Sequence, residues 1–174
     1  VEDIAAVVSF LSKEGFRVIC VIGHSKAGTS VLMAAATAGA LPPNCAVVSI
    51  AGRVRYGKPE KRFTEAELAE ARRSGSFIWK RFGKDWRVSQ GSLEERQTLD
   101  VISMLAKSLP QGVDVLHVHG TKDDMTAVEE ADHVRQSIPG GRCQVALIQD
   151  ANHFFLGKEV EMCDVIRNWL FSKF

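Results

Sequence analysis

The chain alternates between short apolar runs and amphipathic stretches. The apolar runs are rich in β-branched residues, which is typical of strands buried on both faces of a parallel sheet. They predict strands at 17–22, 46–50, 113–119 and 143–148. Helical spacing of apolar residues, or a high alanine content, predicts helices at 2–14, 26–38, 92–108, 126–138 and 158–172. This alternation indicates an α/β fold, with a mostly parallel sheet and helices on both faces.

Residues 53–91 differ from this pattern because they are charged, aromatic and interrupted by glycine and proline. We expect an insertion of short helices here, one of them at about 64–73. Residues 53–87 carry 11 Lys/Arg and 5 Asp/Glu, although the whole chain has a formal net charge of only +1. This basic segment fits either attraction of an anionic substrate or partner, or a solvated helical face. Aromatic side chains of the insertion fit either an acyl pocket or a small core: Tyr56, Phe63, Phe77, Trp79, Phe82 and Trp86.

Composition narrows the class of protein. The 174 residues are 45% apolar and 25% charged, which indicates a single globular domain and excludes a disordered or low-complexity chain. No apolar run is long enough to span a bilayer, and near-neutral charge without a binding motif argues against nucleic acid as a partner. The four cysteines form no CxxC pair, so we expect mostly buried, reduced thiols and a cytoplasmic location.

The most specific motif is Val-Ile-Gly-His-Ser-Lys-Ala-Gly at 21–28, between a predicted strand and a predicted helix. A tight turn of this kind presents its serine above the sheet edge and needs small residues beside it. Ser25 is therefore the candidate nucleophile. The backbone amide of Lys26 would point at a developing oxyanion from the helix N-terminus, whereas the Lys26 side chain fits either contact with an anionic substrate or exposure to solvent.

A serine nucleophile needs a base and an orienting acid, which follow such a turn in the order acid, then histidine. Asp123 follows the third predicted strand and His153 follows the fourth. Both come at carboxyl ends of strands, where open parallel sheets carry their sites. Asp124 competes with Asp123 for the acid's role, and Asp150 is a further candidate that more plausibly shapes the turn before His153.

Parts of the sequence also resemble a phosphate-binding loop and a zinc site. Gly23, Gly28 and Thr29 resemble a phosphate-binding loop, with Asp150 as a possible magnesium partner, but threonine stands where that loop needs lysine. His117 and His119 share one strand face close to Asp123, but a zinc site needs further ligands. Core or supporting histidines explain the pair better. We therefore expect neither a metal nor an organic cofactor.

Three motifs in this order resemble the α/β-hydrolase fold serine hydrolases: the turn at 23–28, His-Gly-Thr-x-Asp at 119–123, and Ala-Asn-His-Phe at 151–154. The similarity is greatest to the fungal and plant branch with Gly-His-Ser-Lys-Gly-Gly, related to serine aminopeptidases and lysophospholipases. Residues 1–174 would then form the C-terminal portion of such a domain, with a cap-like insertion at 53–91. Ala27 replaces the usual second glycine of the serine motif.

The resemblance implies early strands and a second oxyanion donor upstream of residue 1, so we expect a preceding segment or a second chain to complete the sheet. It also implies hydrolysis of a carboxylic ester or related acyl bond in a small-molecule substrate. The catalytic residues would be Ser25, Asp123 and His153. The alternative is a non-catalytic scaffold or ligand-binding subunit of the same fold.

Overall fold

The computed structural model describes residues 1–56, 62–81 and 83–174, and it divides them into two compact units. The first unit comprises Val1–Arg55 and Val101–Phe174, and the second comprises Tyr56–Asp100. The second unit overlaps the insertion expected at 53–91 but begins at Tyr56 and continues to Asp100, and the cap role of that insertion stays a prediction. None of the helices in the described ranges combines the length and the apolarity needed to cross a membrane.

The first unit is built on a four-stranded sheet in the order β1-β2-β5-β6, with every neighbouring pair parallel. The strands are β1 (Cys20–His24), β2 (Ala46–Ile50), β5 (Val115–Gly120) and β6 (Cys143–Ile148). The predicted fold class is confirmed, although the first strand begins three residues later than expected. With β1 at one end of the sheet, the expected completion by an upstream segment or second chain stays a prediction.

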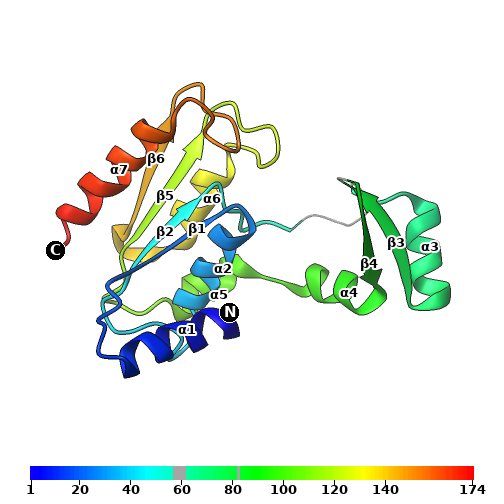
Figure 1. Ribbon diagram of the computed structural model, residues 1–174, viewed down its shortest axis with the longest axis horizontal. Helices are drawn as coiled ribbons and strands as arrows, with labels where there is room; N and C mark the ends of the chain where they lie inside the picture. The colour runs from blue at the N-terminus through cyan, green and yellow to red at the C-terminus, as the bar shows by residue number, and fades with distance from the viewer. Residues whose placement is uncertain (57–61, 82) are drawn as a thin grey trace. The chain divides into compact units, whose positions relative to one another are not determined.

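Helices cover both faces of this sheet (Figure 1). They are α2 (Lys26–Ala35), α5 (Val101–Ser108), α6 (Glu130–Ser137) and α7 (Glu159–Phe171). Helix α1 (Glu2–Lys13) packs against α2, and a short 3-10 helix, η2 (Pro139–Gly141), precedes β6. Helix α7 packs on one face, and α2, α5 and α6 pack on the other. The helix predicted at 126–138 begins only at Glu130, because the side chain of Asp123 holds the preceding residues in a turn.

The two faces of the sheet differ in chemistry because successive side chains in a strand point in opposite directions. Val48, Leu116 and Val118 belong to an apolar core that includes Ile166 and Trp169 of α7. The alternate positions of β2 and β5 lie on the opposite face. That face includes three buried polar side chains, Ser49, His117 and His119.

The second unit contains a hairpin that the sequence analysis did not predict. Its elements are α3 (Glu65–Ser74), the antiparallel strands β3 (Ser76–Arg81) and β4 (Lys84–Ser89), and α4 (Gln90–Thr98). Helix α3 matches the helix expected at 64–73. The second unit has a small core of its own, which contains Phe63, Leu68, Ala71, Phe77, Trp79, Val88 and Leu93. The aromatic residues named above thus supply core to this unit, except that Trp86 is exposed, Tyr56 is outside this cluster and Phe82 lies outside the described residues.

The prediction of a single helix at 92–108 is wrong. Two helices, α4 and α5, replace it, because Leu99 between them has an extended backbone with ψ of 106°. The helix also begins earlier than predicted. The hydroxyl of Ser89 accepts the backbone amide of Ser92, in the first turn of α4.

Candidate active site

Ser25 occupies a sharp turn between β1 and α2, with φ of 57° and ψ of −118°. A non-glycine residue in this region costs about 1–3 kcal/mol and persists only where its surroundings hold it. The Ser25 amide donates to the carbonyl oxygen of Ile50 at 2.8 Å, which ties the turn to β2. A Cβ on Gly23 would clash with the carbonyl of Ala27, and one on Gly28 would lie 2.8 Å from the Ile50 oxygen. By contrast Ala27 is exposed, so its methyl group fits.

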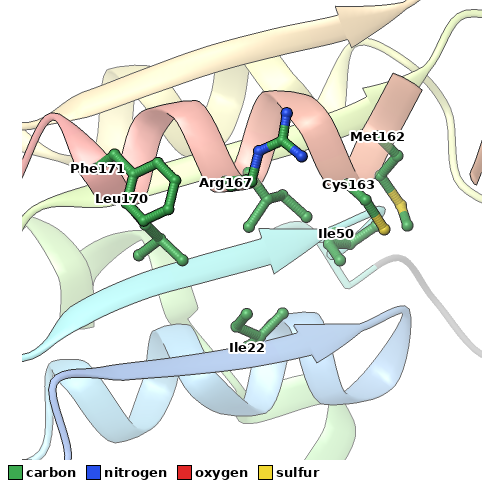
Figure 2. A pocket seen from close by; sticks show the side chains of 8 residues that line it. Ile22, Ile50, Met162, Cys163, Arg167, Leu170 and Phe171 are labelled. Atoms are coloured by element: carbon green, nitrogen blue, oxygen red, sulfur yellow. The ribbon is translucent and has the colours of Figure 1, made fainter. Parts of the chain in front are cut away.

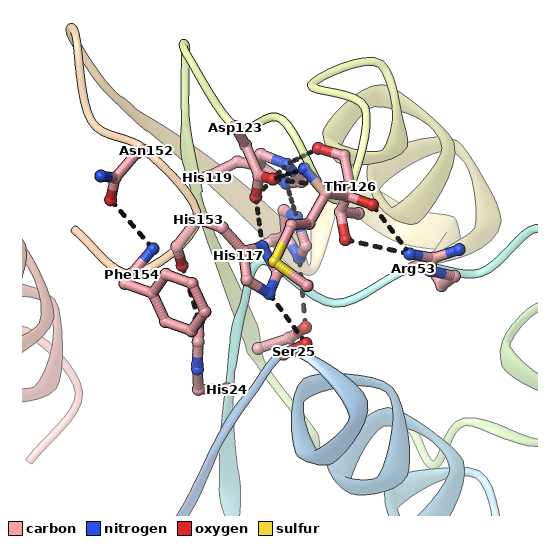
Figure 3. A network of polar contacts seen from close by, with 12 residues as sticks. His24, Ser25, Arg53, His117, His119, Asp123, Thr126, Asn152, His153 and Phe154 are labelled. Atoms are coloured by element: carbon pink, nitrogen blue, oxygen red, sulfur yellow. Dashed lines mark hydrogen bonds and ion pairs between the residues drawn. The ribbon is translucent and has the colours of Figure 1, made fainter. Parts of the chain in front are cut away.

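The structure brings Ser25, His153 and Asp123 together from three different strand ends (Figure 3). His153 Nε2 lies 2.9 Å from Ser25 Oγ, and His153 Nδ1 lies 2.8 Å from Asp123 Oδ2. The Asp123 side chain is fully buried and that of His153 is 2% exposed. Because a carboxylate only accepts, His153 Nδ1 carries a proton and Nε2 is free to accept one from the serine hydroxyl.

Asp123 is held by its own loop. Its Oδ1 accepts the backbone amides of Met125 at 2.9 Å and Thr126 at 2.7 Å, which leaves Oδ2 directed at His153. The two competing acids lie elsewhere. Asp124 is exposed, and Asp150 pairs with Lys122 at 2.8 Å. The hydrogen bond and charge of Lys122 lower the pKa of Asp150 below its usual range.

The loop that carries His153 has two further supports that the sequence analysis did not assign. His24 Nε2 donates to the backbone oxygen of His153 at 2.7 Å, and the two rings lie 5.0 Å apart. Asn152 Oδ1 accepts the amides of Phe154 and Leu156. Asn152 was detectable as an Asx turn two residues before Phe154, whereas the His24 contact joins residues 129 apart and has no local signal.

Beneath Asp123, two buried histidines form a hydrogen-bonded pair. His117 Nε2 lies 3.1 Å from His119 Nδ1, so these nitrogens face one another and not a shared metal ion. Within the described residues, no cluster of three or more His, Cys, Asp or Glu side chains could hold a metal. Burial, with a smaller contribution from His119, lowers the pKa of His117 to about 3, so His117 is neutral near pH 7.

Lys26 is the first residue of α2, which places its amide at the helix N-terminus directly after Ser25. Its side chain is exposed. The position that would need a lysine in a phosphate-binding loop is the buried Thr29, whose hydroxyl donates to the Arg53 carbonyl and accepts the Arg53 amide. Thr29 thus ties α2 to the loop after β2 through these two hydrogen bonds.

An apolar pocket of about 390 Å³ lies between α7 and the strands β1 and β2 (Figure 2). It is lined by Ile22, Ile50, Met162, Cys163, Ile166, Arg167, Leu170 and Phe171. The residues of the Ser25–His153–Asp123 chain are not among those that line it.

All four cysteines are free thiols. Cys45 and Cys143 are buried, Cys20 is half-buried and Cys163 is exposed. Burial raises the pKa of both Cys20 and Cys143 to about 12, so these thiols are poor nucleophiles. The cytoplasmic location stays a prediction.

No family model matches the sequence, and a search of curated proteins finds no match. Solved structures do match. The esterase domain of a Rhodothermus marinus protein is 20% identical, with a TM-score of 0.63 over 91% of this chain and 62% of its own. Est1E from Butyrivibrio proteoclasticus is 18% identical, with a TM-score of 0.71 over 98% and 67%. The mouse alpha/beta hydrolase domain-containing protein 10 is 18% identical, with a TM-score of 0.64 over 98% and 68%.

The chain spans about two thirds of the length of these three proteins. At such identities the likeness shows the fold alone, and that fold is the α/β-hydrolase fold.

Proposed function

We propose that this chain, which has the α/β-hydrolase fold, acts as a serine hydrolase on a carboxylic ester or a related acyl bond of a small molecule. The observation that carries the proposal is the hydrogen-bonded chain from Ser25 to the buried side chains of His153 and Asp123, at 2.9 Å and 2.8 Å. These distances are those needed for a serine, its base and an orienting acid. The strained turn at Ser25 supports the same proposal.

In the proposed reaction His153 Nε2 takes the proton of Ser25 as Oγ attacks the acyl carbon. Asp123 holds the imidazole in the tautomer that can accept this proton and stabilises the imidazolium that results. The amide of Lys26, at the start of α2, donates to the oxyanion. His153 then returns the proton to the leaving alcohol. Water, activated by His153 in turn, releases the acid from the acyl-enzyme.

Finer features of the proposal rest on the resemblance. They are membership in the branch related to serine aminopeptidases and lysophospholipases, and the role of a cap insertion for Tyr56–Asp100, which follows β2 in the chain. In that role this unit would select the acyl substrate.

The proposal is tested with a panel of chromogenic esters and thioesters of increasing acyl length. Ser25→Ala should lower kcat by more than about 10⁴-fold, and Asp123→Asn by about 10⁴-fold. Asp124→Asn is the matched control, because it alters an exposed acid one residue away and should leave kcat within about twofold. If Ser25→Ala hydrolyses esters at the wild-type rate, the proposal is wrong. No hydrolysis of any ester by the wild type would favour the non-catalytic scaffold.

A further inference from the structure

A second chain of buried polar contacts leads away from Asp123. His119 Nε2 lies 3.0 Å from the backbone oxygen of Thr126 and 3.4 Å from Asp123 Oδ2. His119 Nδ1 lies 3.1 Å from His117 Nε2, and His117 Nδ1 lies 3.2 Å from Ser49 Oγ. Ser49 and His117 are register partners in the adjacent strands β2 and β5, and the side chains of Ser49, His117 and His119 are fully buried.

One carbonyl group fixes the protons along this chain. The Thr126 oxygen can only accept, so His119 carries a proton on Nε2. A neutral His119 then accepts at Nδ1, which requires a proton on Nε2 of His117. His117 in turn accepts the Ser49 hydroxyl at Nδ1. Each donor thus has an acceptor, and the His119 N–H faces a second one, Asp123 Oδ2.

Burying the polar groups of Ser49, His117 and His119 costs free energy. Neighbouring positions on the same strands, Val47 and Val115, are apolar and fully buried. A buried polar group is tolerated when it is hydrogen-bonded, but apolar side chains of similar shape usually serve stability equally well. Stability alone therefore does not explain two histidines and a serine here, and their connection to Asp123 offers a reason.

We propose that His119, aligned by His117 and Ser49, is a positioning residue for Asp123 in the proposed hydrolysis. Its single N–H faces both the Thr126 carbonyl and Asp123 Oδ2, so it holds the acid turn at its two ends. Arg53 holds the same turn from another loop, donating to the Met125 oxygen and the Thr126 hydroxyl. Neither His119 nor His117 touches Ser25; they act by keeping Oδ2 on His153 Nδ1.

The inference rests on the proposed function, and its test compares donors with non-donors at the same position. His119→Leu removes the N–H at similar size and should lower kcat about 10- to 100-fold with KM nearly unchanged, as loss of an outer partner does around metal ligands. His119→Gln keeps an N–H donor and should restore kcat to within about threefold of the wild type. His117→Leu should cause a smaller loss, about tenfold or less, since it only misaligns His119. His133→Leu, in α6, is the matched histidine control and should change nothing.

Two NMR readouts separate this inference from the proposed function. In ¹⁵N-histidine spectra His117 should be neutral with its proton on Nε2, and His119 should carry a proton on Nε2, in the wild type and in Ser25→Ala alike. The proton on His153 Nδ1 should give a downfield resonance that moves in His119→Leu and returns in His119→Gln. An inactive wild type would defeat the proposed function. An active wild type whose His119→Leu variant keeps both kcat and the His153 resonance would overturn this inference alone, as would an equal loss of kcat in His119→Gln and His119→Leu.

Discussion

At the scale of single residues, the tightest constraint lies in the turn that presents Ser25. Ser25 has a positive φ, and its amide donates to the Ile50 carbonyl. Nearby, Gly28 closely approaches Ile50 and Gly52. All of these features lie where the start of α2 meets the end of β2. The strain at Ser25 persists because this contact holds it. Larger side chains that push α2 away from β2 should therefore lower the stability of the protein and displace Ser25.

Gly28→Ala should destabilise the protein by about 1–3 kcal/mol, the usual effect of forcing extra carbon into a packed interior. The added Cβ would lie 2.8 Å from a backbone oxygen and 3.1 Å from the Gly52 Cα, and neither atom is the end of a flexible side chain. Urea unfolding measures the change. Gly91→Ala is the control, since its Cβ meets open space on helix α4 and should leave stability equal or higher. Equal effects in the two variants would contradict this account of the turn.

His117 should make stability depend on pH. Its pKa is lowered to about 3 in the folded protein, whereas an unfolded histidine has its ordinary pKa near 6.5. The unfolded state therefore binds a proton that the folded state does not, and the free energy of unfolding falls as pH drops below about 6.5. The slope from this one group reaches at most about 1.4 kcal/mol per pH unit.

Urea unfolding of the wild type and of His117→Gln between pH 7 and pH 5 measures this contribution. The wild type should lose more stability than the variant over that interval, and His133→Gln should follow the wild type. If the wild type and His117→Gln lose stability in parallel, the buried neutral state of His117 is not what the structure indicates.

At the scale of elements, the strands β2 and β6 were predictable because apolar runs bounded by turns encode a buried parallel strand locally. The hairpin β3–β4 was missed although it alternates: Phe77 is buried and Ile78 is exposed. The charges around these residues obscured the period of two. The break between α4 and α5 at Leu99 involves neither glycine nor proline, so it left no signal in the sequence.

The candidate site shows the same division. Ser25, Asp123 and His153 were identifiable because each follows a predicted strand in a short motif. The contacts Ser49–His117 and His24–His153 were not, since they depend on which strands become neighbours and in what register. Local sequence signals the three residues that these hydrogen bonds join, and the pairing of distant strands determines what supports them.

A mutation in the core of the second unit should destabilise that unit and leave the four-stranded sheet of the first unit unchanged. Phe77 packs edge-to-face on Phe63 at 5.2 Å and is 6% exposed, so Phe77→Ala should cost about 3–5 kcal/mol locally. Hydrogen exchange should show lost protection of amides in β3 and β4 and unchanged protection in β2 and β5. Ile78→Ala, on the exposed side of the same strand, should leave both sheets protected. Loss of protection in β2 and β5 as well would contradict separate cores.

At the scale of the whole molecule, the matches to solved structures show the fold, but a fold of this kind hosts many activities. Identities of 18–20% carry no substrate with them. The case for hydrolysis therefore depends on the geometry around Ser25 and not on the sheet. The basic stretch at 53–87 still fits either attraction of an anionic substrate or partner, or a solvated helical face.

The central claim is that Ser25 is an activated nucleophile, and labelling by a fluorophosphonate tests it most directly. Intact mass should show one phosphonyl adduct on the wild type, none on Ser25→Ala, and much slower labelling of Asp123→Asn than of Asp124→Asn. An adduct of equal yield on Ser25→Ala, or no adduct on a folded wild type, would contradict the account.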